Sequence, residues 1–245
     1  MKVELIDSMG TDLTVVNAAR VSFAKESEWE YSGENDGLYP LKSRNDAVLS
    51  APDQGLIKYL SKHNHWTPFS HVMIQMREKV PIFVARQRFK HMVGFTYNEV
   101  SRRYVDDAPE FFTPKEWRGA PENAKQGSSD KVIEEDLLIL DHTYEGDFGG
   151  VDGYLYGYDE IVKLCEEWYT NAIKNNVAPE QARMILPQSM YTEYYVTGSL
   201  AAWARAYKQR IDSHAQLEIQ ELAGMWGDVI GSMEELEYSW EALTE

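Results

Sequence analysis

Cationic side chains are concentrated in one short stretch of an otherwise acidic chain. The 245 residues include 24 Lys and Arg against 40 Asp and Glu, which gives a formal net charge of −16 at pH 7. Residues 86–104 read RQRFKHMVGFTYNEVSRRY and contain six side chains that are or can become positive: Arg86, Arg88, Lys90, His91, Arg102 and Arg103. Arginine can hold a phosphate through two parallel hydrogen bonds, and the nearby Asn98, Glu99 and Ser101 can bind the edges of a ring or a sugar. The stretch therefore predicts a nucleotide site.

Two other interpretations of this stretch stay open on the residues alone. The arginines can pair with acidic side chains on the surface, where such ion pairs contribute little. Alternatively, Phe89, Phe95 and Tyr97 alternate with the cations as in a groove for single-stranded nucleic acid. The negative total charge disfavours this groove because it repels polyanions, so we expect no nucleic-acid partner.

Two arginines further along the chain lack a simple structural explanation. Arg183 lies in the apolar segment PEQARMILP, where it either extends its charge to the surface or faces an anion. Arg210 precedes Ser213 and Gln216, whose spacing is that of a capping box, so we expect the last long helix to begin there. A cation just before a helix N-terminus is unfavourable unless an anion lies between them, which favours a ligand at Arg210.

The histidines and the single cysteine give weaker signals. His63, His65 and His71 in HNHWTPFSH lack helical i, i+4 spacing and have no carboxylate beside them, so we expect ligand contacts or structural roles and no metal site. Cys165 has two acidic neighbours that disfavour a thiolate, and we expect it to pack rather than react. The chain has no P-loop, G-x-G-x-x-G or G-x-S-x-G motif, so another architecture must hold any nucleotide cofactor.

Hydrophobic periodicity predicts a mixture of strands and helices to position these residues. Alternation predicts strands at 2–6, 72–80 and 190–197. Spacings of three and four predict helices at 12–23, 52–62, 82–93, 131–144, 158–175, 199–209 and 214–232, with a short helix after Pro179. Segments 25–45 and 105–160 are predicted to be loop excursions, the second around the helix at 131–144. We expect an α+β fold, a single domain over 1–245 in which helices pack around a mixed or antiparallel sheet.

The remaining composition excludes several protein classes. The first residues, MKVELIDSMG, lack the apolar core of a signal peptide, and the sequence contains no run of about 18 apolar residues that could span a membrane. A lone cysteine cannot form an internal disulfide or a Cys-based zinc site. We expect a cytoplasmic protein without a membrane segment.

The cationic stretch and three further segments resemble the flavin-dependent thymidylate synthases. The signature of that family is a basic-His-basic triplet, a spacer and then N-E-x-S-x-R-Y; this chain has KHM at 90–92 and NEVSRRY at 98–104. In the family's order it also has H-x-T-P-F at 65–69, A-R-Q at 85–87, A-R-x-x-L-P at 182–187 and R-x-D-S-H-A-Q at 210–216. The resemblance covers roughly residues 53–104 and 179–222.

The resemblance implies a ligand for each of these residues. It assigns dUMP to Gln87, Arg88, Lys90, Glu99, Ser101, Arg102, Arg103, Arg183 and Arg210. It assigns FAD to His65, Thr67, Lys90, His91, Met92, Asn98, Glu99, Ser199 and Arg205. It makes Arg210 catalytic, because this residue would polarise the pyrimidine. Lys90 and Met92 stand where the family has arginine, and a lysine keeps the charge but loses the planar fork.

The implied activity is reductive methylation of dUMP to dTMP. Methylenetetrahydrofolate would donate the carbon, NADPH-reduced FAD would supply the hydride, and a homotetramer would share active sites between subunits. Other thymidylate synthases activate the uracil ring by cysteine attack, for which Cys165 is poorly placed. Two rival classes are a nucleotide-binding module without chemistry and a metal-dependent hydrolase using His63, His65 and His71.

Overall fold

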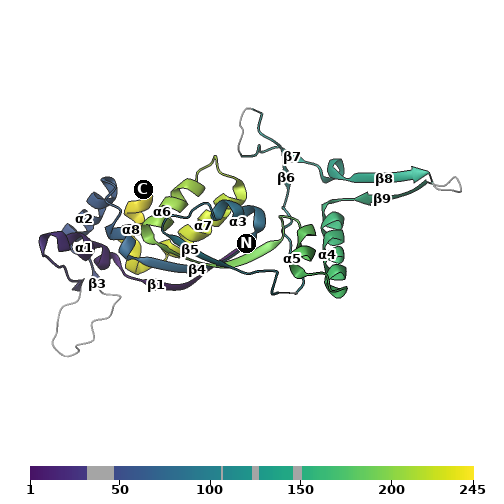
Figure 1. The fold of residues 1–245 in the computed structure, drawn as a ribbon. Coiled ribbons are helices and arrows are strands. Elements are labelled where there is room, and N and C mark those ends of the chain that lie inside the picture. The colour runs from purple at the N-terminus through teal and green to yellow at the C-terminus, as the bar shows by residue number, and fades with distance from the viewer. Residues whose placement is uncertain (32–46, 106, 123–126, 146–150) are drawn as a thin grey trace, which may run out of the picture.

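A four-stranded antiparallel sheet forms the centre of the protein (Figure 1). The computed structural model describes residues 1–31, 47–105, 107–122, 127–145 and 151–245. The strands lie in the order β1-β4-β10-β5, namely β1 (Lys2–Met9), β4 (Met73–Pro81), β10 (Tyr191–Ser199) and β5 (Phe95–Glu99). The predicted α+β fold with an antiparallel sheet is confirmed.

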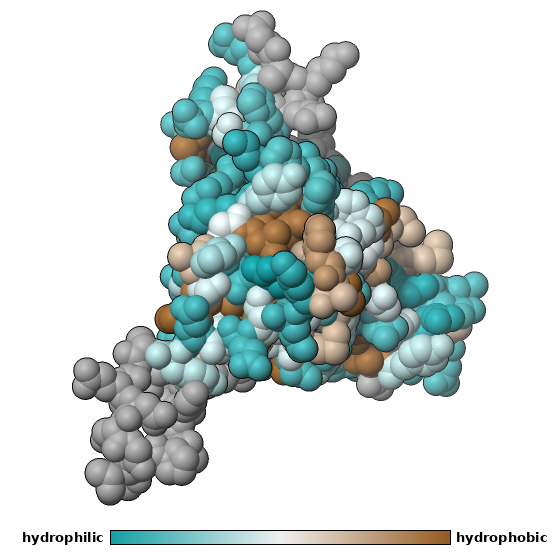
Figure 2. Space-filling model, turned by 90° about the vertical axis from the view of Figure 1, so that its left-hand side faces the viewer, coloured by the Kyte–Doolittle hydropathy of each residue, from teal (hydrophilic) through white to brown (hydrophobic). Residues whose placement is uncertain are grey.

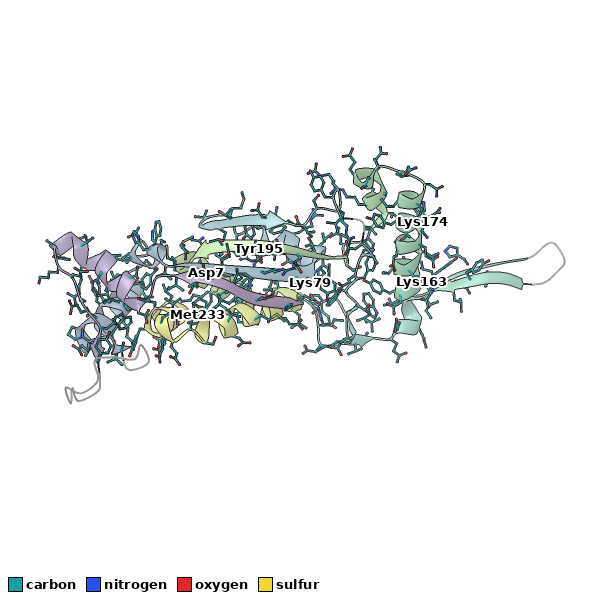
Figure 3. The ribbon with its side chains drawn as sticks, turned by 90° about the horizontal axis from the view of Figure 1, so that it is seen from below. Asp7, Lys79, Lys163, Lys174, Tyr195 and Met233 are labelled. Atoms are coloured by element: carbon teal, nitrogen blue, oxygen red, sulfur yellow. The ribbon has the colours of Figure 1, made fainter. Side chains whose placement is uncertain are left out.

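One face of the sheet is buried and the other is exposed. In β4 the buried side chains alternate strictly as Ile74, Met76, Glu78 and Val80, which is the period of two that places every second residue on one face. Figure 3 looks onto the opposite face, on which Lys79 and Tyr195 are labelled. The alternation therefore fixes which side of the sheet builds the core, and it places one charged residue, Glu78, inside it.

Helices cover the buried face of the sheet. The helices α3 (Ile82–Arg88), α6 (Leu200–Arg210) and α7 (Leu217–Gly231) lie above the strands in Figure 1. The helices α1 (Asp12–Arg20), α2 (Ala51–Lys62) and α8 (Glu237–Thr244) form one end of the molecule. Trp203 and Trp226 are fully buried where α6 packs against α7, with ring centroids 5.7 Å apart. No helix in the described part of the chain combines the length and hydropathy of a membrane span.

A separate group of elements forms the other end of the molecule. We call residues 117–156 the arm: it contains β6 (Trp117–Arg118), β7 (Val132–Ile133), β8 (Leu140–Glu145) and β9 (Val151–Tyr156). β6 pairs with β7 and β8 pairs with β9, all antiparallel. The helices α4 (Tyr158–Lys174) and α5 (Pro179–Ala182) connect the arm back to β10.

The arm contradicts two predictions. The prediction of a helix at 131–144 is wrong, because this segment forms β7, a 3₁₀ turn at Glu135–Leu138 and β8. The loop expected after it is also wrong, since it contains β9, which pairs with β8 from Leu140 opposite Tyr156 to Glu145 opposite Val151. A strand that forms only by pairing with a partner further along the chain is hard to recognise from its local sequence. The apolar Leu137, which a helix would have buried, is 74% exposed.

Other predicted boundaries also change. β5 and α8 were not predicted, and α3 ends at Arg88 rather than continuing to Val93, which is 74% exposed. α7 begins at Leu217, later than expected. In the excursion expected at 25–45, the short strand β2 (Glu30–Tyr31) pairs with β3 (Ala47–Val48), which lies just beyond it, and residues 32–46 lie outside the described part. Strands 72–80 and 190–197 and helices 52–62, 158–175 and 199–209 are confirmed within two residues at each end.

An ion pair lies inside the core beneath α3. Arg88 and Glu78 have no exposed side-chain surface, and Arg88 Nε lies 3.3 Å from both carboxylate oxygens. Tyr194 donates a hydrogen bond to Glu78, and Arg88 Nη1 donates to the Tyr97 hydroxyl at 2.6 Å. Aromatic rings surround the guanidinium, with centroid distances of 4.4 Å to Phe95, 4.8 Å to Trp203 and 4.6 Å to Trp226. Such a cation is held by charge, hydrogen bonds and ring faces together.

Removing one member of this pair should destabilise the protein strongly. Glu78→Gln leaves the Arg88 charge buried without a counter-ion, so we expect the free energy of unfolding to fall by about 3–5 kcal/mol. Urea unfolding measures this loss. The matched control is Glu193→Gln on β10, which breaks the exposed Arg77–Glu193 pair and should cost about 1 kcal/mol or less. Equal losses in the two variants would contradict the prediction.

Candidate functional site

A cavity of about 590 Å³ lies where β5 ends and β10 begins, near α5. Four of the predicted residues line it: Glu99, Ser101, Arg102 and Arg183. Glu99 ends β5, after which the chain turns and brings Ser101 and Arg102 to the wall. Arg183 comes from the 3₁₀ turn Arg183–Ile185 that follows α5. Two segments that are about 80 residues apart in sequence thus meet at one cavity.

Carboxylates balance the cations around this cavity. Arg102, with 13% of its side chain exposed, bonds to the backbone carbonyl of Asp107 and lies 3.2 Å from its carboxylate. Lys79 pairs with Glu110 at 2.5 Å, and Glu99 Oε1 accepts a hydrogen bond from Thr192 at 2.6 Å. The cavity therefore offers guanidinium and ammonium groups to a phosphate, together with ordered acceptors for a ring or a sugar.

A second group of predicted residues gathers around His91. Arg210 Nε donates to His91 Nε2 at 2.8 Å, and the imidazole is only 7% exposed. Burial, followed by the positive charges of Arg210, Arg88 and Arg205, lowers the pKa of His91 to about 4. Burial and the charge of Arg88 also lower the pKa of Arg210. The imidazole is consequently neutral near pH 7 and can accept the hydrogen bond that orients the Arg210 guanidinium.

The position of Arg210 differs from the sequence prediction. Arg210 is the last residue of α6, where a cation interacts favourably with the negative end of the helix dipole. Ser213 does not cap α7, because that helix begins at Leu217 with Gln216 in the capping position and no side-chain capping bond. The prediction that an anion must lie between Arg210 and the start of α7 is therefore wrong. The hydrogen bond to His91 positions the Arg210 guanidinium.

The loop after α3 carries the residues of the basic motif. Lys90 is exposed and Met92 is 73% exposed, while His91 points inward. Gly94 turns the chain into β5 with φ of +82°, and a Cβ there would lie 2.8 Å from that of Ala202. A left-handed conformation and a close approach both require glycine at this point.

Other predicted residues have structural contacts of their own. Ser199 caps α6 by accepting a hydrogen bond from the Ala202 amide at 3.3 Å, and Arg205 donates to the carbonyl of Val93. Arg103 is exposed and stacks on Tyr104, and Asn98 is exposed on β5. Arg88, which was expected to hold the nucleotide, lies fully buried in the core against Glu78 and lines neither the Arg183 cavity nor the His65 cavity.

His65 and Thr67 lie at the opposite end of the molecule. They line a cavity of about 620 Å³ between α1 and α2, together with Tyr59 and Trp66. Figure 2 faces this end and shows a hydrophobic patch bordered by hydrophilic side chains; Phe23, which also lines the cavity, is 76% exposed. This cavity and the Arg183 cavity share no lining residue, so one chain does not bring the two groups of predicted residues together.

The three histidines do not converge on one point. The rings of His63 and His65 lie 6.4 Å apart, and His71 lines a different depression beside α1. Within the described residues, no group of three or more His, Cys, Asp or Glu side chains is placed to hold a metal ion. Cys165 is a half-buried residue of α4 that lines neither cavity.

Sequence reasoning missed several residues that shape the site. Glu78 and Tyr97 hold Arg88, and Tyr97 also donates to the backbone carbonyl of His91 at 2.6 Å. Glu78 could have been found, because it occupies a core position in the alternating pattern of β4. Tyr97 was noted only as an aromatic residue among cations, since its strand was not predicted.

Comparison with known proteins gives consistent results. The family described as Thymidylate synthase complementing protein matches residues 4–231. A flavin-dependent thymidylate synthase from Thermosipho melanesiensis is 33% identical over 219 residues, which cover 89% of this chain and 80% of that protein. One from Thermus thermophilus is 31% identical over 243 residues, which cover 99% of this chain and 75% of that protein. The crystal structure of the UMP/dUMP methylase PolB from Streptomyces cacaoi bound with 5-Br dUMP is similar with a TM-score of 0.66 and 26% identity, over 99% of this chain and 94% of that one.

The lowered pKa of His91 predicts a specific pH dependence of stability. The folded protein protonates His91 only near pH 4, whereas the unfolded chain protonates it near 6.5. The unfolded state therefore binds more protons between these values, and the free energy of unfolding decreases as pH falls from 6.5 to 4. His91→Gln keeps an acceptor for Arg210 but does not titrate, so we expect a shallower decrease in urea unfolding over this window. Parallel curves for the two proteins, or an NMR titration of His91 near pH 6.5, would contradict this.

Proposed function

The chain belongs to the thymidylate synthase complementing proteins, the family of flavin-dependent thymidylate synthases, and from this premise we propose that it methylates dUMP to dTMP. FAD is the proposed flavin, methylenetetrahydrofolate the carbon donor and NADPH the reductant. The observation that carries the proposal is the cavity in which Ser101, Arg102 and Arg183 meet, because these are the motif residues expected to hold a nucleotide.

The nucleotide would bind across the two groups of site residues. Arg102 and Arg183 are positioned for the phosphate, which can replace the Asp107 carboxylate at Arg102. Ser101, Glu99 and Gln87 would contact the sugar and the ring. The exposed Lys90 and Arg103 would complete the charge compensation, whereas the buried Arg88 pairs with Glu78 and would not contact the nucleotide.

Arg210 would carry the electrostatic part of the chemistry. Methylation at carbon 5 of uracil places negative charge on the pyrimidine, and a preorganised cation stabilises such charge more than water does. The neutral His91 holds the Arg210 guanidinium without cancelling its charge. Cys165 lies on α4 outside both cavities and does not offer the thiol that other thymidylate synthases use.

The exposed residues of the motif loop fit the chemistry of a flavin nucleotide. Lys90 offers a cation for a phosphate. Met92 and Val93 are 73% and 74% exposed and offer apolar surface to a ring. A bound reduced flavin supplies the hydride that completes the methyl group. His65 and Thr67 line a cavity that shares no residue with the Arg183 cavity, so a second copy in the proposed homotetramer would bring them to the nucleotide.

The visible absorption spectrum tests the proposal most directly. After incubation with FAD and removal of the unbound fraction, we expect a stoichiometric flavin spectrum that shifts when dUMP is added. Formation of dTMP from dUMP, with UMP assayed beside it, then tests the activity. A protein that retains no flavin in either condition but binds dUMP would be a nucleotide-binding module instead.

Substitution of the cavity arginines should weaken substrate binding. Arg102→Ala and Arg183→Ala each remove a charge-assisted hydrogen bond to the phosphate, so we expect dUMP to bind about 10- to 100-fold more weakly by calorimetry. Lys163→Ala on α4 is the control for a lost surface charge and should bind dUMP like the wild type. Unchanged binding in both arginine variants would exclude this cavity as the phosphate site.

A further inference from the structure

Arg118 of the arm reaches the helical layer over the sheet. Its Nη2 donates to Glu218 Oε1 at 2.5 Å, and its Nε donates to the Ser128 hydroxyl at 2.9 Å. The Trp117 ring packs on Tyr158 at 5.2 Å, which holds β6 against the start of α4. The arm therefore places a cation at the first turn of α7.

Glu218 remains a carboxylate although it is buried. It is 6% exposed, and burial alone would raise its pKa, but hydrogen bonds from Arg118, its backbone amide and Gln216 outweigh burial and lower the pKa. Its place in the first turn of α7 also favours a negative charge. The Arg118–Glu218 pair is thus a fixed ionic contact between the arm and the helical layer.

Two further hydrogen bonds link this ion pair to Gln87, a residue that is predicted to bind the nucleotide. Gln216 Nε2 donates to Glu218 Oε2 at 2.7 Å, and Gln87 Nε2 donates to Gln216 Oε1 at 2.5 Å. Because a carboxylate only accepts, Glu218 forces the Gln216 amide to present its oxygen to Gln87. Gln87 must then present its amide nitrogen to Gln216. Its own oxygen accepts no hydrogen bond from a described residue, so it is available to a donor.

We propose that Arg118 is a positioning residue which, through Glu218 and Gln216, orients the Gln87 amide so that its oxygen accepts a hydrogen bond from an N–H or O–H group of the nucleotide. This inference rests on the proposed function and deepens it. Arg118 does not touch the nucleotide itself, and it acts by selecting one of the two orientations of an amide. Without the Arg118–Glu218 ion pair, the side-chain amides of Gln216 and Gln87 can both flip. The Gln87 oxygen then faces Gln216 part of the time and is not available to the nucleotide.

Steady-state kinetics of the flavin-loaded enzyme with dUMP tests the inference. Misorientation of a binding amide affects ground state and transition state alike, so Arg118→Ala should raise KM for dUMP about tenfold and leave kcat within about twofold. In a Gln87→Ala background, the same change should raise KM less than about twofold, because the two residues act through one chain of hydrogen bonds. Arg118→Lys keeps the charge and should restore part of the affinity.

Controls separate positioning from a general effect on the arm. Tyr158→Phe removes the hydrogen bond to the Phe112 carbonyl at 2.7 Å but leaves the chain from Arg118 intact, so its KM should equal that of the wild type. If Arg118→Ala alone unfolds the protein, Arg118→Ala with Glu218→Gln leaves no buried charge unpaired and should show the same rise in KM.

The outcomes distinguish this inference from the proposed function. An unchanged KM in the Arg118 variants, full additivity with Gln87→Ala, or an equal rise in Tyr158→Phe overturns the positioning role while the enzyme stays active. A wild-type protein that neither binds dUMP nor forms dTMP overturns the proposed function and the positioning role with it.

Discussion

The buried ion pair between Arg88 and Glu78 is the constraint on which the candidate site depends. Moving two charges out of water costs several kcal/mol per ion, and only good geometry and further hydrogen bonds offset this cost. Here Tyr194 donates to the carboxylate, Tyr97 accepts from Arg88 Nη1, and aromatic rings surround the guanidinium, whose Nη2 has no hydrogen-bond partner among the described residues. These partners come from α3, β4, β5, β10, α6 and α7, so the pair forms only when the sheet and its helical layer are assembled together.

Arg88 also affects the candidate site in two ways. Tyr97 accepts from Arg88 and donates to the carbonyl of His91, which fixes the start of the loop after α3. The charge of Arg88 also adds to burial in lowering the pKa of both His91 and Arg210. A neutral imidazole is the result, and it orients Arg210 without neutralising it. A carboxylate in the place of His91 would hold the guanidinium as well but would cancel its charge.

Local patterns predicted the parts of this structure that local interactions determine. The alternation in β4 and the apolar stripes of α4 and α6 gave correct elements because each reports a face that is buried. The segment 131–144 was assigned wrongly because β8 exists only through its pairing with β9. Arg88 has the residue type of a ligand contact, and only the packing of α6 and α7 places it in the core. The motif residues of the cavity were predicted from their order along the chain, but the separation of His65 from them follows from the tertiary structure.

The distribution of charge suits a small phosphate ligand and disfavours a long polyanion. With a net charge of −16, the surface repels polyanions, while Lys79, Arg102 and Arg183 line one cavity. Asp107 and Glu110 already pair with Arg102 and Lys79 there, so a phosphate that binds either of these two cations must displace a carboxylate. A nucleotide monophosphate can repay this exchange, because its phosphate forms bidentate bonds and its ring adds contacts at Gln87 and Arg210. An isolated phosphate gains only the first of these terms. In the proposed binding mode, the competing carboxylates therefore favour a ligand that contacts both groups of residues over a free phosphate.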